Sequence, residues 1–319
     1  MHAAVVHSFD TPPRFDTVPA PTPAGDHEVL VDVLAAGLHP RVRSAADGSH
    51  YTSDGALPFV PGIDGVGRTR EGELLYFVAP DTALGTMAEQ AVVDHRRAVP
   101  LPPDADPIAV AAGMNPGMSS WVALRRRISF RPGGCLLVLG ATGNAGRLAV
   151  QIAKHLGASR VIAAGRDPQR LSLVASLGAD DVISLDGTDE AVAQRLAAVA
   201  ADTDVVLDYL WGPPARRAMP ALLQARTDRS KPVTWIQIGS IAGQDLTLPS
   251  ALLRAANLTI MGSGQGSVTT REIVAELPFL AHEISSGALA VNPLPFPLEQ
   301  VERAWSTPSL AGRRIVLMP

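Results

Sequence analysis

The sequence predicts an α/β fold that combines a strand-rich part with a doubly wound parallel sheet. Three observations support this prediction. Residues 1–110 are interrupted by many prolines and read as strands and loops, because proline disrupts helices. Residues 135–262 alternate short apolar runs with helical stretches, which is typical of a parallel sheet with helices on both faces. Residues 285–319 return to strand-like and short helical pieces, so we expect this tail to rejoin the first part.

The first clear element is a strand over 28–37, "EVLVDVLAAG", where apolar and polar residues partly alternate. The expected central strands are "CLLVLG" (135–140), "RVIAAG" (160–165), "DDVIS" (180–184), "DVVLDYL" (204–210), "VTWIQIG" (233–239) and "LTIMGS" (258–263). The expected helices between them are 144–157, 168–178 and 189–200. In the first helix Leu148, Ile152 and Leu156 form one buried stripe, and Gly157 is placed as its C-terminal cap.

A glycine-rich turn, "VLGATGNAG" (138–146), connects the first central strand to the first central helix. Glycine permits a tight turn and a close approach of the backbone to a pyrophosphate, and the helix N-terminus attracts the anion. We therefore expect a dinucleotide to bind here. The expected contacts are Gly140, Thr142, Gly143, Asn144, Ala145 and Gly146.

The end of the second central strand predicts which nucleotide binds. A site for NAD usually places Asp or Glu about 20 residues after the loop, on the ribose 2′-hydroxyl. Here that position is Gly165, and Arg166 follows it, which leaves room and positive charge for a 2′-phosphate. Arg170 either assists or is a solvated helix arginine, and a shift of one residue would make Asp167 the ribose acid. We predict NADPH as the cofactor.

Composition excludes several classes of protein. The chain has 319 residues, 46% hydrophobic side chains and a formal charge of −4, which fits about two domains and gives no basic surface for nucleic acid. The single cysteine, Cys135, excludes an intramolecular disulfide and a cysteine-rich zinc site. The N-terminus lacks the apolar core of a signal peptide, and no apolar run approaches the roughly 20 residues of a membrane span. We expect a cytoplasmic protein without membrane or nucleic-acid partners.

Stretches along nearly the whole chain resemble the medium-chain dehydrogenase/reductase superfamily, in its zinc-free quinone oxidoreductase-like and enoyl reductase-like branch. They include "EVLVDVLAAGLHP", "PGIDGVG", "GTMAEQAVV", "NPGMSSWVAL", "GATGNAGRLAVQIAKHLGA", "LGADDVIS" and "FPLEQVERAWS". The resemblance implies a GroES-like catalytic domain made of 1–110 and 265–319, a Rossmann domain over 111–264, and a cleft where nicotinamide meets substrate. It also implies a homodimer, often paired through the last Rossmann strand near 257–262.

Zinc enzymes of this superfamily carry a Cys and a His-Glu pair where this chain has Leu38-His39 and Ile63-Asp64. Catalytic zinc needs three protein ligands, so we expect a protein without metal. Asp64 lies between Gly62 and Gly65 and is interpreted as a structural turn residue.

The resemblance also suggests catalytic residues. His39 stands where this branch often has Asn, and either donates a hydrogen bond or proton to the substrate or is held by a backbone partner. Tyr51 falls beside the expected substrate, or is merely packed. Ser119 aligns with a Thr that contacts the nicotinamide side, or is a helix cap or exposed serine.

The remaining expected cofactor contacts lie outside the glycine loop. Asn115 precedes Pro116 and is interpreted either as a cofactor contact or, slightly favoured, as a turn residue. Gly239 and Ser240 end a strand at the carboxyl edge of the sheet, where the family contacts the nicotinamide.

The resulting hypothesis is a zinc-independent, NADPH-dependent reductase of a quinone or an α,β-unsaturated carbonyl. Two alternatives remain: a reductase of another aldehyde or ketone, and a non-catalytic NADP(H) sensor. The loop also looks like that of atypical short-chain dehydrogenases, whose catalytic members use Tyr-x-x-x-Lys. Neither Tyr51, Tyr76 nor Tyr209 has a lysine four residues later, so that family is disfavoured.

Overall fold

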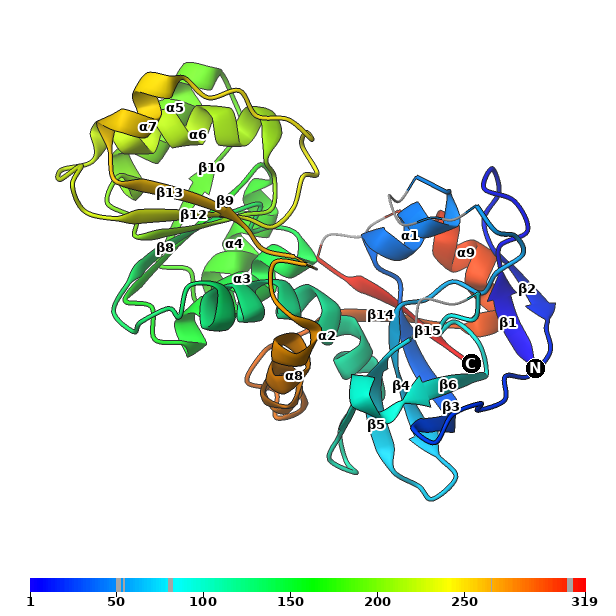
Figure 1. Ribbon diagram of the computed structural model, residues 1–319. Coiled ribbons are helices and arrows are strands. Elements are labelled where there is room, and N and C mark those ends of the chain that lie inside the picture. Colours follow the sequence, from blue (N-terminus) through cyan, green and yellow to red (C-terminus); the bar gives the residue numbers. More distant parts are fainter. Residues whose placement is uncertain (50–52, 54, 80–82, 265, 309–311) are drawn as a thin grey trace. The chain divides into compact units, whose positions relative to one another are not determined.

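The computed structural model describes residues 1–49, 53, 55–79, 83–264, 266–308 and 312–319 (Figure 1). The chain divides into one unit of Met1–Asn115 with Val274–Pro319 and a second unit of Pro116–Ile273. The borders thus lie at 115/116 and 273/274, where the sequence predicted 110/111 and 264/265. The predicted fold class, a strand-rich part plus a parallel-sheet Rossmann part, is confirmed.

The first unit contains a mostly antiparallel sheet of order β14-β15-β3-β4-β5-β7, with β6 also paired to β3, and a separate β1-β2 pair. Both chain ends meet in it, because β15 pairs with β3 through Val316 opposite Gly37 (Figure 1). The strands are β1 (His2–Val5), β2 (Arg14–Thr17), β3 (Glu28–Gly37), β4 (Asp64–Thr69), β5 (Leu74–Val78), β6 (Gln90–Asp94), β7 (Ala98–Pro100), β14 (Pro293–Pro297) and β15 (Arg314–Met318).

Short helices join these strands, and two longer helices cross the borders between the units. The short ones are α1 (Pro40–Ala46), α9 (Val301–Ser306) and the single turns η1 (His95–Arg97) and η3 (Leu298–Gln300). The longer ones are α2 (Pro107–Val122), which continues into the π-helical turn η2 (Ala123–Arg127), and α8 (Thr270–Ser285). A core of Ala36, Val42, Met87, Val301 and Leu317 packs β3 and β15 against α1 and α9.

The second unit is a parallel sheet of order β10-β9-β8-β11-β12-β13. From β8 the chain adds β9 and β10 on one side, then returns and adds β11, β12 and β13 on the other side. The boundary between β8 and β11 is the switch point at which doubly wound sheets bind ligands. Its strands are β8 (Cys135–Leu139), β9 (Arg160–Gly165), β10 (Asp181–Ser184), β11 (Val205–Asp208), β12 (Val233–Gln237) and β13 (Leu258–Gly262). Its helices are α3 (Asn144–His155), α4 (Pro168–Ser176), α5 (Asp189–Ala200), α6 (Gly212–Ala225) and α7 (Ser250–Ala255).

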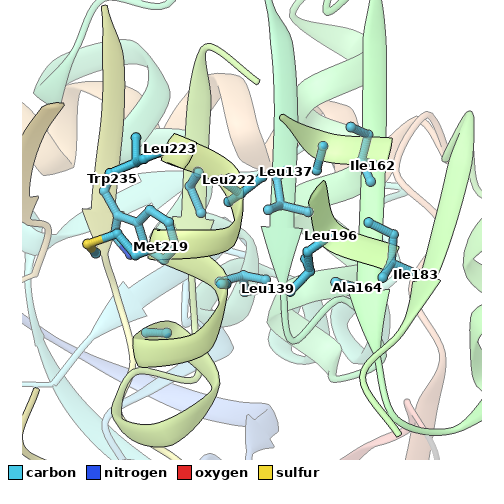
Figure 2. Close-up of a cluster of buried hydrophobic side chains, with 14 of the residues drawn as sticks. Leu137, Leu139, Ile162, Ala164, Ile183, Leu196, Met219, Leu222, Leu223 and Trp235 are labelled. Carbon is cyan, nitrogen blue, oxygen red and sulfur yellow. The ribbon is translucent and has the colours of Figure 1, made fainter. Parts of the chain in front are cut away.

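Helices cover both faces of this sheet (Figure 1). On one face, Leu137, Ile162 and Trp235 of the strands pack against Leu196 of α5 and Met219 of α6 (Figure 2). Alternate strand residues face opposite sides, so β8 and β9 present a second apolar row to α3 and α4. The predicted strands and helices of this region are all present, and Gly157 follows α3 with φ +86°, as expected of a C-terminal cap.

Two turn interpretations are wrong. Asn115 lies inside α2, where Pro116 is tolerated within the helix, and Asp64 is the first residue of β4. Both errors arose because a neighbouring proline or glycine was taken as a turn signal, and the surrounding packing overrides that local preference.

No helix among the described residues is long and apolar enough to cross a bilayer.

Candidate active site

The turn between β8 and α3 has the geometry of an anion site. Gly140 follows β8 with φ +88°, a conformation that disfavours any residue with a side chain. Gly143 is the N-cap of α3 and provides no side-chain cap, so no side chain of this residue fills the space in front of the helix N-terminus. Free helical amides and the helix dipole together attract a phosphate.

The glycines of the turn are needed for different reasons. A Cβ on Gly146 would lie 2.2 Å from the carbonyl oxygen of Gly140, so only glycine lets α3 pack this closely on the turn. A Cβ on Gly143 would meet nothing nearer than that oxygen at 3.7 Å. The protein itself therefore does not require glycine at 143, but a bound pyrophosphate approaching the backbone would. The residues present fit a dinucleotide.

At the end of β9, Gly165 faces the same turn. A Cβ there would lie 2.5 Å from Cγ2 of Thr142, which explains why no ribose-binding acid occupies this position. Arg166 is exposed and has no hydrogen bond or ion pair with other residues that the structure describes. Its guanidinium is available to a ligand.

Asp167, the alternative candidate for a ribose-binding acid, already has hydrogen-bond partners within the protein. Asp167 is the N-cap of α4, and its Oδ1 accepts hydrogen bonds from the backbone N–H groups of Gln169 and Arg170. Its Oδ2 lies 3.1 Å from Nε of Arg170. Asp167 therefore caps α4 and forms an ion pair with Arg170, so the guanidinium of Arg170 is not a free cation.

The ends of β11 and β12 lie beside the turn on its other side. The Tyr209 N–H donates to the carbonyl of Leu139, and a Cβ on Gly140 would lie 3.3 Å from Cβ of Tyr209. A Cβ on Gly239 would lie 2.8 Å from the Tyr209 carbonyl oxygen. The half-buried Ser240 follows, with Oγ 3.4 Å from Gln244 Oε1. Gly239 and Ser240 thus stand at the carboxyl edge, as predicted.

Ser119 reaches the same edge from α2. Its Oγ donates to the carbonyl of Pro116 at 2.7 Å and lies 3.0 Å from the hydroxyl of Tyr209. Ser119 is half-buried in the helix interior, so the alternatives of a helix cap and a fully exposed serine are both wrong. Asn115 is half-buried in the same helix, and its contact with a cofactor stays a prediction.

His39 belongs to a buried polar cluster in the first unit. Its side chain is 1% exposed, and Nε2 lies 2.7 Å from Oδ1 of Asp64. Oδ2 of Asp64 accepts a hydrogen bond of 2.8 Å from the Tyr76 hydroxyl. When the Asp64 carboxylate accepts from Nε2–H, the neutral imidazole leaves Nδ1 as an acceptor. Nδ1 has no partner among the described residues.

Charge and burial set the electrostatics of this cluster. Burial raises the pKa of Tyr76 well above its usual value, and the negative charge of Asp64 adds to the effect. Burial lowers the pKa of the nearby Arg314 to about 10, although Asp64 opposes the shift. Asp64 therefore holds a histidine and a tyrosine together inside the sheet, instead of forming the predicted turn.

Tyr51 as a neighbour of the substrate and the absence of a metal both stay predictions. Tyr51 lies outside the described residues. Within the described part of the chain, no group of three or more His, Cys, Asp or Glu side chains could hold a metal ion.

Sequence reasoning missed Asp208 and Tyr209 as site residues. Asp208 is fully buried at the end of β11, and its carboxylate accepts from the N–H groups of Leu210 and Trp211 and from Nε1 of Trp235. Burial raises the pKa of this carboxyl, and those hydrogen bonds oppose the shift. The sequence contained a signal for Asp208, because an acid that ends a buried strand at the carboxyl edge needs hydrogen-bond donors around it.

Known proteins resemble the chain along its whole length. Residues 144–282 match the family described as zinc-binding dehydrogenase. The probable NADPH-dependent quinone reductase tdiC of Emericella nidulans is 32% identical, with all of both chains covered. The chloroplastic NADPH-dependent alkenal/one oxidoreductase of Arabidopsis thaliana is 32% identical over 52% of this chain and 46% of its own length. The quinone oxidoreductase of Thermus thermophilus, solved also in complex with NADPH, superposes with a TM-score of 0.82 at 26% identity, covering 100% of both chains.

Proposed function

The chain belongs to the medium-chain dehydrogenase/reductase superfamily, in its quinone-reductase-like branch, and we propose that it is an NADPH-dependent reductase of quinones or α,β-unsaturated carbonyls that works without zinc. The observation that carries the proposal is the turn at the start of α3. Its Gly143 has room for a pyrophosphate, while Gly165 and Arg166 replace the ribose acid of an NAD site.

The residues of the chain bind and orient the cofactor. The amides at the start of α3 hold the pyrophosphate, and the exposed Arg166 pairs with the 2′-phosphate. NADPH, when bound, supplies the hydride. A quinone or a conjugated carbonyl is electron-poor, so it needs mainly to be held against the nicotinamide, and water can deliver the proton.

Two observations support chemistry without zinc. His39 and Asp64, the candidate ligands, are bonded to each other at 2.7 Å and buried. Cys135, at the start of β8, lies in the other unit, and burial raises the pKa of its thiol, which disfavours the thiolate that binds metal. The names of the Emericella and Arabidopsis relatives support the acceptor class.

Nucleotide titration tests the cofactor. We expect wild type to bind NADPH about 10- to 100-fold more tightly than NADH, because a charge-assisted contact is worth roughly 1.5–3 kcal/mol. Arg166→Ala should remove most of this preference. Arg170→Ala is the matched control and should keep it, because Arg170 pairs with Asp167. Equal affinities in wild type, or an unchanged preference in Arg166→Ala, would contradict the assignment.

Turnover tests the reaction. We expect NADPH oxidation with at least one member of a panel of quinones, enones and alkenals, undiminished after dialysis against a chelator. Stoichiometric zinc whose removal abolishes turnover would contradict the metal-free mechanism. If the protein binds NADPH but oxidises it with no acceptor of the panel, a sensor function replaces the proposed one. Activity with simple aldehydes or ketones alone would favour the other reductase class.

The proposed homodimer is supported by the edge of the second sheet. Among the described strands, β13 is the last in the order and pairs only with β12, and Ile260 on it is 36% exposed. An edge strand with free backbone groups can pair with a second copy. Ile260→Lys should then shift sedimentation from dimer to monomer, and a wild-type monomer would contradict the proposal. The cytoplasmic location stays a prediction.

A further inference from the structure

The hydroxyls of Ser119 and Tyr209 form a directed pair at the carboxyl edge. A serine hydroxyl carries one proton and two acceptor lone pairs. Ser119 donates its proton to the Pro116 carbonyl at 2.7 Å, and a carbonyl can only accept. In the bond of 3.0 Å between the two hydroxyls, the donor is therefore Tyr209. Ser119 keeps one lone pair, on a side chain that is only half-buried.

Tyr209 is held rigidly in this position. Burial of its phenol raises the pKa of that group to about 12, so it remains a neutral donor at physiological pH. The neighbouring Ser120, fully buried, lies 3.3 Å from the Gly117 carbonyl, a long bond, and its hydroxyl also donates to the phenol oxygen, which leaves the phenol proton to Ser119. The backbone that carries Tyr209 is fixed by the Asp208 carboxylate, which accepts from the N–H groups of the two residues after it.

The loop that follows β11 and contains Tyr209 has a strained backbone. Trp211 has φ 53° and ψ −163°, a conformation that non-glycine residues rarely adopt, and Gly212 follows with φ +54°. A strained residue persists only where its surroundings enforce it, and such residues cluster at functional sites. A Cβ on Gly212 would lie 2.8 Å from Cα of Gly243. The loop after β12 therefore packs directly against the backbone of the loop after β11.

The position of the pair relative to the nucleotide follows from the strand order. The pyrophosphate site follows β8, and the residues for the adenosine 2′-phosphate follow β9 on one side of it. The opposite end of an extended dinucleotide must then lie on the other side, over the ends of β11 and β12. Tyr209 lies between Gly140 and Gly239, on the β11–β12 side of the sheet edge.

We propose that Tyr209 is a positioning residue that fixes Ser119 as a hydrogen-bond acceptor for the carboxamide N–H₂ of the nicotinamide. Ser119 then acts on the cofactor and not as a proton donor to the substrate, because its only proton is engaged by Pro116. The inference rests on the cofactor part of the proposed function and is independent of the substrate.

Binding of three probes tests the proposal by calorimetry without turnover. The probes are NADP⁺, its 3-acetylpyridine analogue, in which a methyl replaces the N–H₂, and 2′-phospho-ADP-ribose, which lacks the nicotinamide. Wild type should bind NADP⁺ about three- to tenfold more tightly than the analogue, as expected for one hydrogen bond. Ser119→Ala should bring this ratio close to one, and Tyr209→Phe should lower it below about twofold.

Controls separate positioning from general support of the fold. Both variants should bind 2′-phospho-ADP-ribose as wild type does. Ser120→Ala, which removes a neighbouring hydroxyl that no ligand can reach, should keep the wild-type ratio, because Tyr209 still donates to Ser119.

Three results would overturn the inference. They are an unchanged ratio in Ser119→Ala or Tyr209→Phe, an equal loss of ratio in Ser120→Ala, and a parallel loss of 2′-phospho-ADP-ribose binding in Tyr209→Phe. Each of these can occur with normal NADP⁺ binding by wild type, and then the proposed function stands. A wild type that binds no NADP⁺ removes the cofactor itself, and the inference with it.

Discussion

The carboxyl edge of the second unit and the His39 cluster of the first use polar groups in opposite ways. At the edge, Gly143 leaves space and puts no cap side chain in front of α3, and Arg166 is exposed without a partner among the described residues. In the first unit, His39, Asp64 and Tyr76 are buried and bonded to one another. A ligand site needs unsatisfied groups, whereas a buried cluster must satisfy its own. The comparison indicates that nucleotide binding and structural support are separated between these regions.

The largest expected effect separates two glycines of one turn. Gly146→Ala should lower the free energy of unfolding by about 3 kcal/mol and abolish NADPH binding, because the new Cβ overlaps the Gly140 carbonyl. Gly143→Ala should unfold as wild type does but bind NADPH at least tenfold more weakly, because its Cβ takes the space of the pyrophosphate. Denaturant unfolding and NADPH titration measure both. Normal NADPH affinity in Gly143→Ala would show that the space at 143 is not the phosphate site.

Alkaline unfolding compares one tyrosine from each region, the half-buried Tyr209 and the buried Tyr76. Below pH 10 the phenol of Tyr209 is protonated in both states, but between pH 10 and about 12 only the unfolded chain ionises. The free energy of unfolding should therefore fall as pH rises through this window, by roughly 2–3 kcal/mol for this group. Tyr209→Phe should remove that part of the loss. Tyr76→Phe should also flatten the curve above pH 10, because burial and, to a smaller extent, Asp64 raise the pKa of Tyr76. Parallel curves for all three proteins would refute the assignment.

Asp64→Asn tests whether the buried cluster is structural. The oxygen of the new amide can accept from Nε2 of His39, but its N–H₂ then faces the Tyr76 hydroxyl, whose proton loses its acceptor. In the reverse orientation the imidazole proton must move to Nδ1, which becomes a buried donor without a partner among the described residues. We expect the free energy of unfolding to fall by about 2 kcal/mol with an unchanged Kd for NADPH. Asp32→Asn, an exposed acid on the same sheet, is the matched control and should change stability by less than about 0.5 kcal/mol. A weakened affinity for NADPH in Asp64→Asn would break the separation of the two regions.

The smallest expected effect concerns Asp167. If this acid only caps α4, Asp167→Ala should cost about 1 kcal/mol of unfolding free energy. Affinity for NADPH should stay or rise, because a negative charge leaves the neighbourhood of the 2′-phosphate. Melting curves and nucleotide titration check both. A selective loss of NADH binding would instead identify Asp167 as a ribose acid.

The nucleotide half of the candidate site was largely predictable because its requirements are local. Gly140, Gly143 and Gly146 follow a strand and open a helix within a few residues. The positive φ of Gly140 and the close approach of Gly146 to the Gly140 carbonyl restrict those two positions to glycine. Helix α2 was not predictable in this way. Pro116 within it is a local signal against helix, and burial of residues such as Met114 and Trp121 outweighs that signal.

By itself, the sequence determined the alternation of strands and helices, the glycine-rich turn between the first central strand and helix, and a glycine at 165, because periodicity and glycine spacing are read within one segment. Only the tertiary structure decided which polar side chains meet. His39 and Asp64 are 25 residues apart in the chain, and Ser119 and Tyr209 are 90 apart. Whether a histidine or a serine donates, accepts or is already engaged depends on the partner that folding brings to it, and no local pattern encodes that partner.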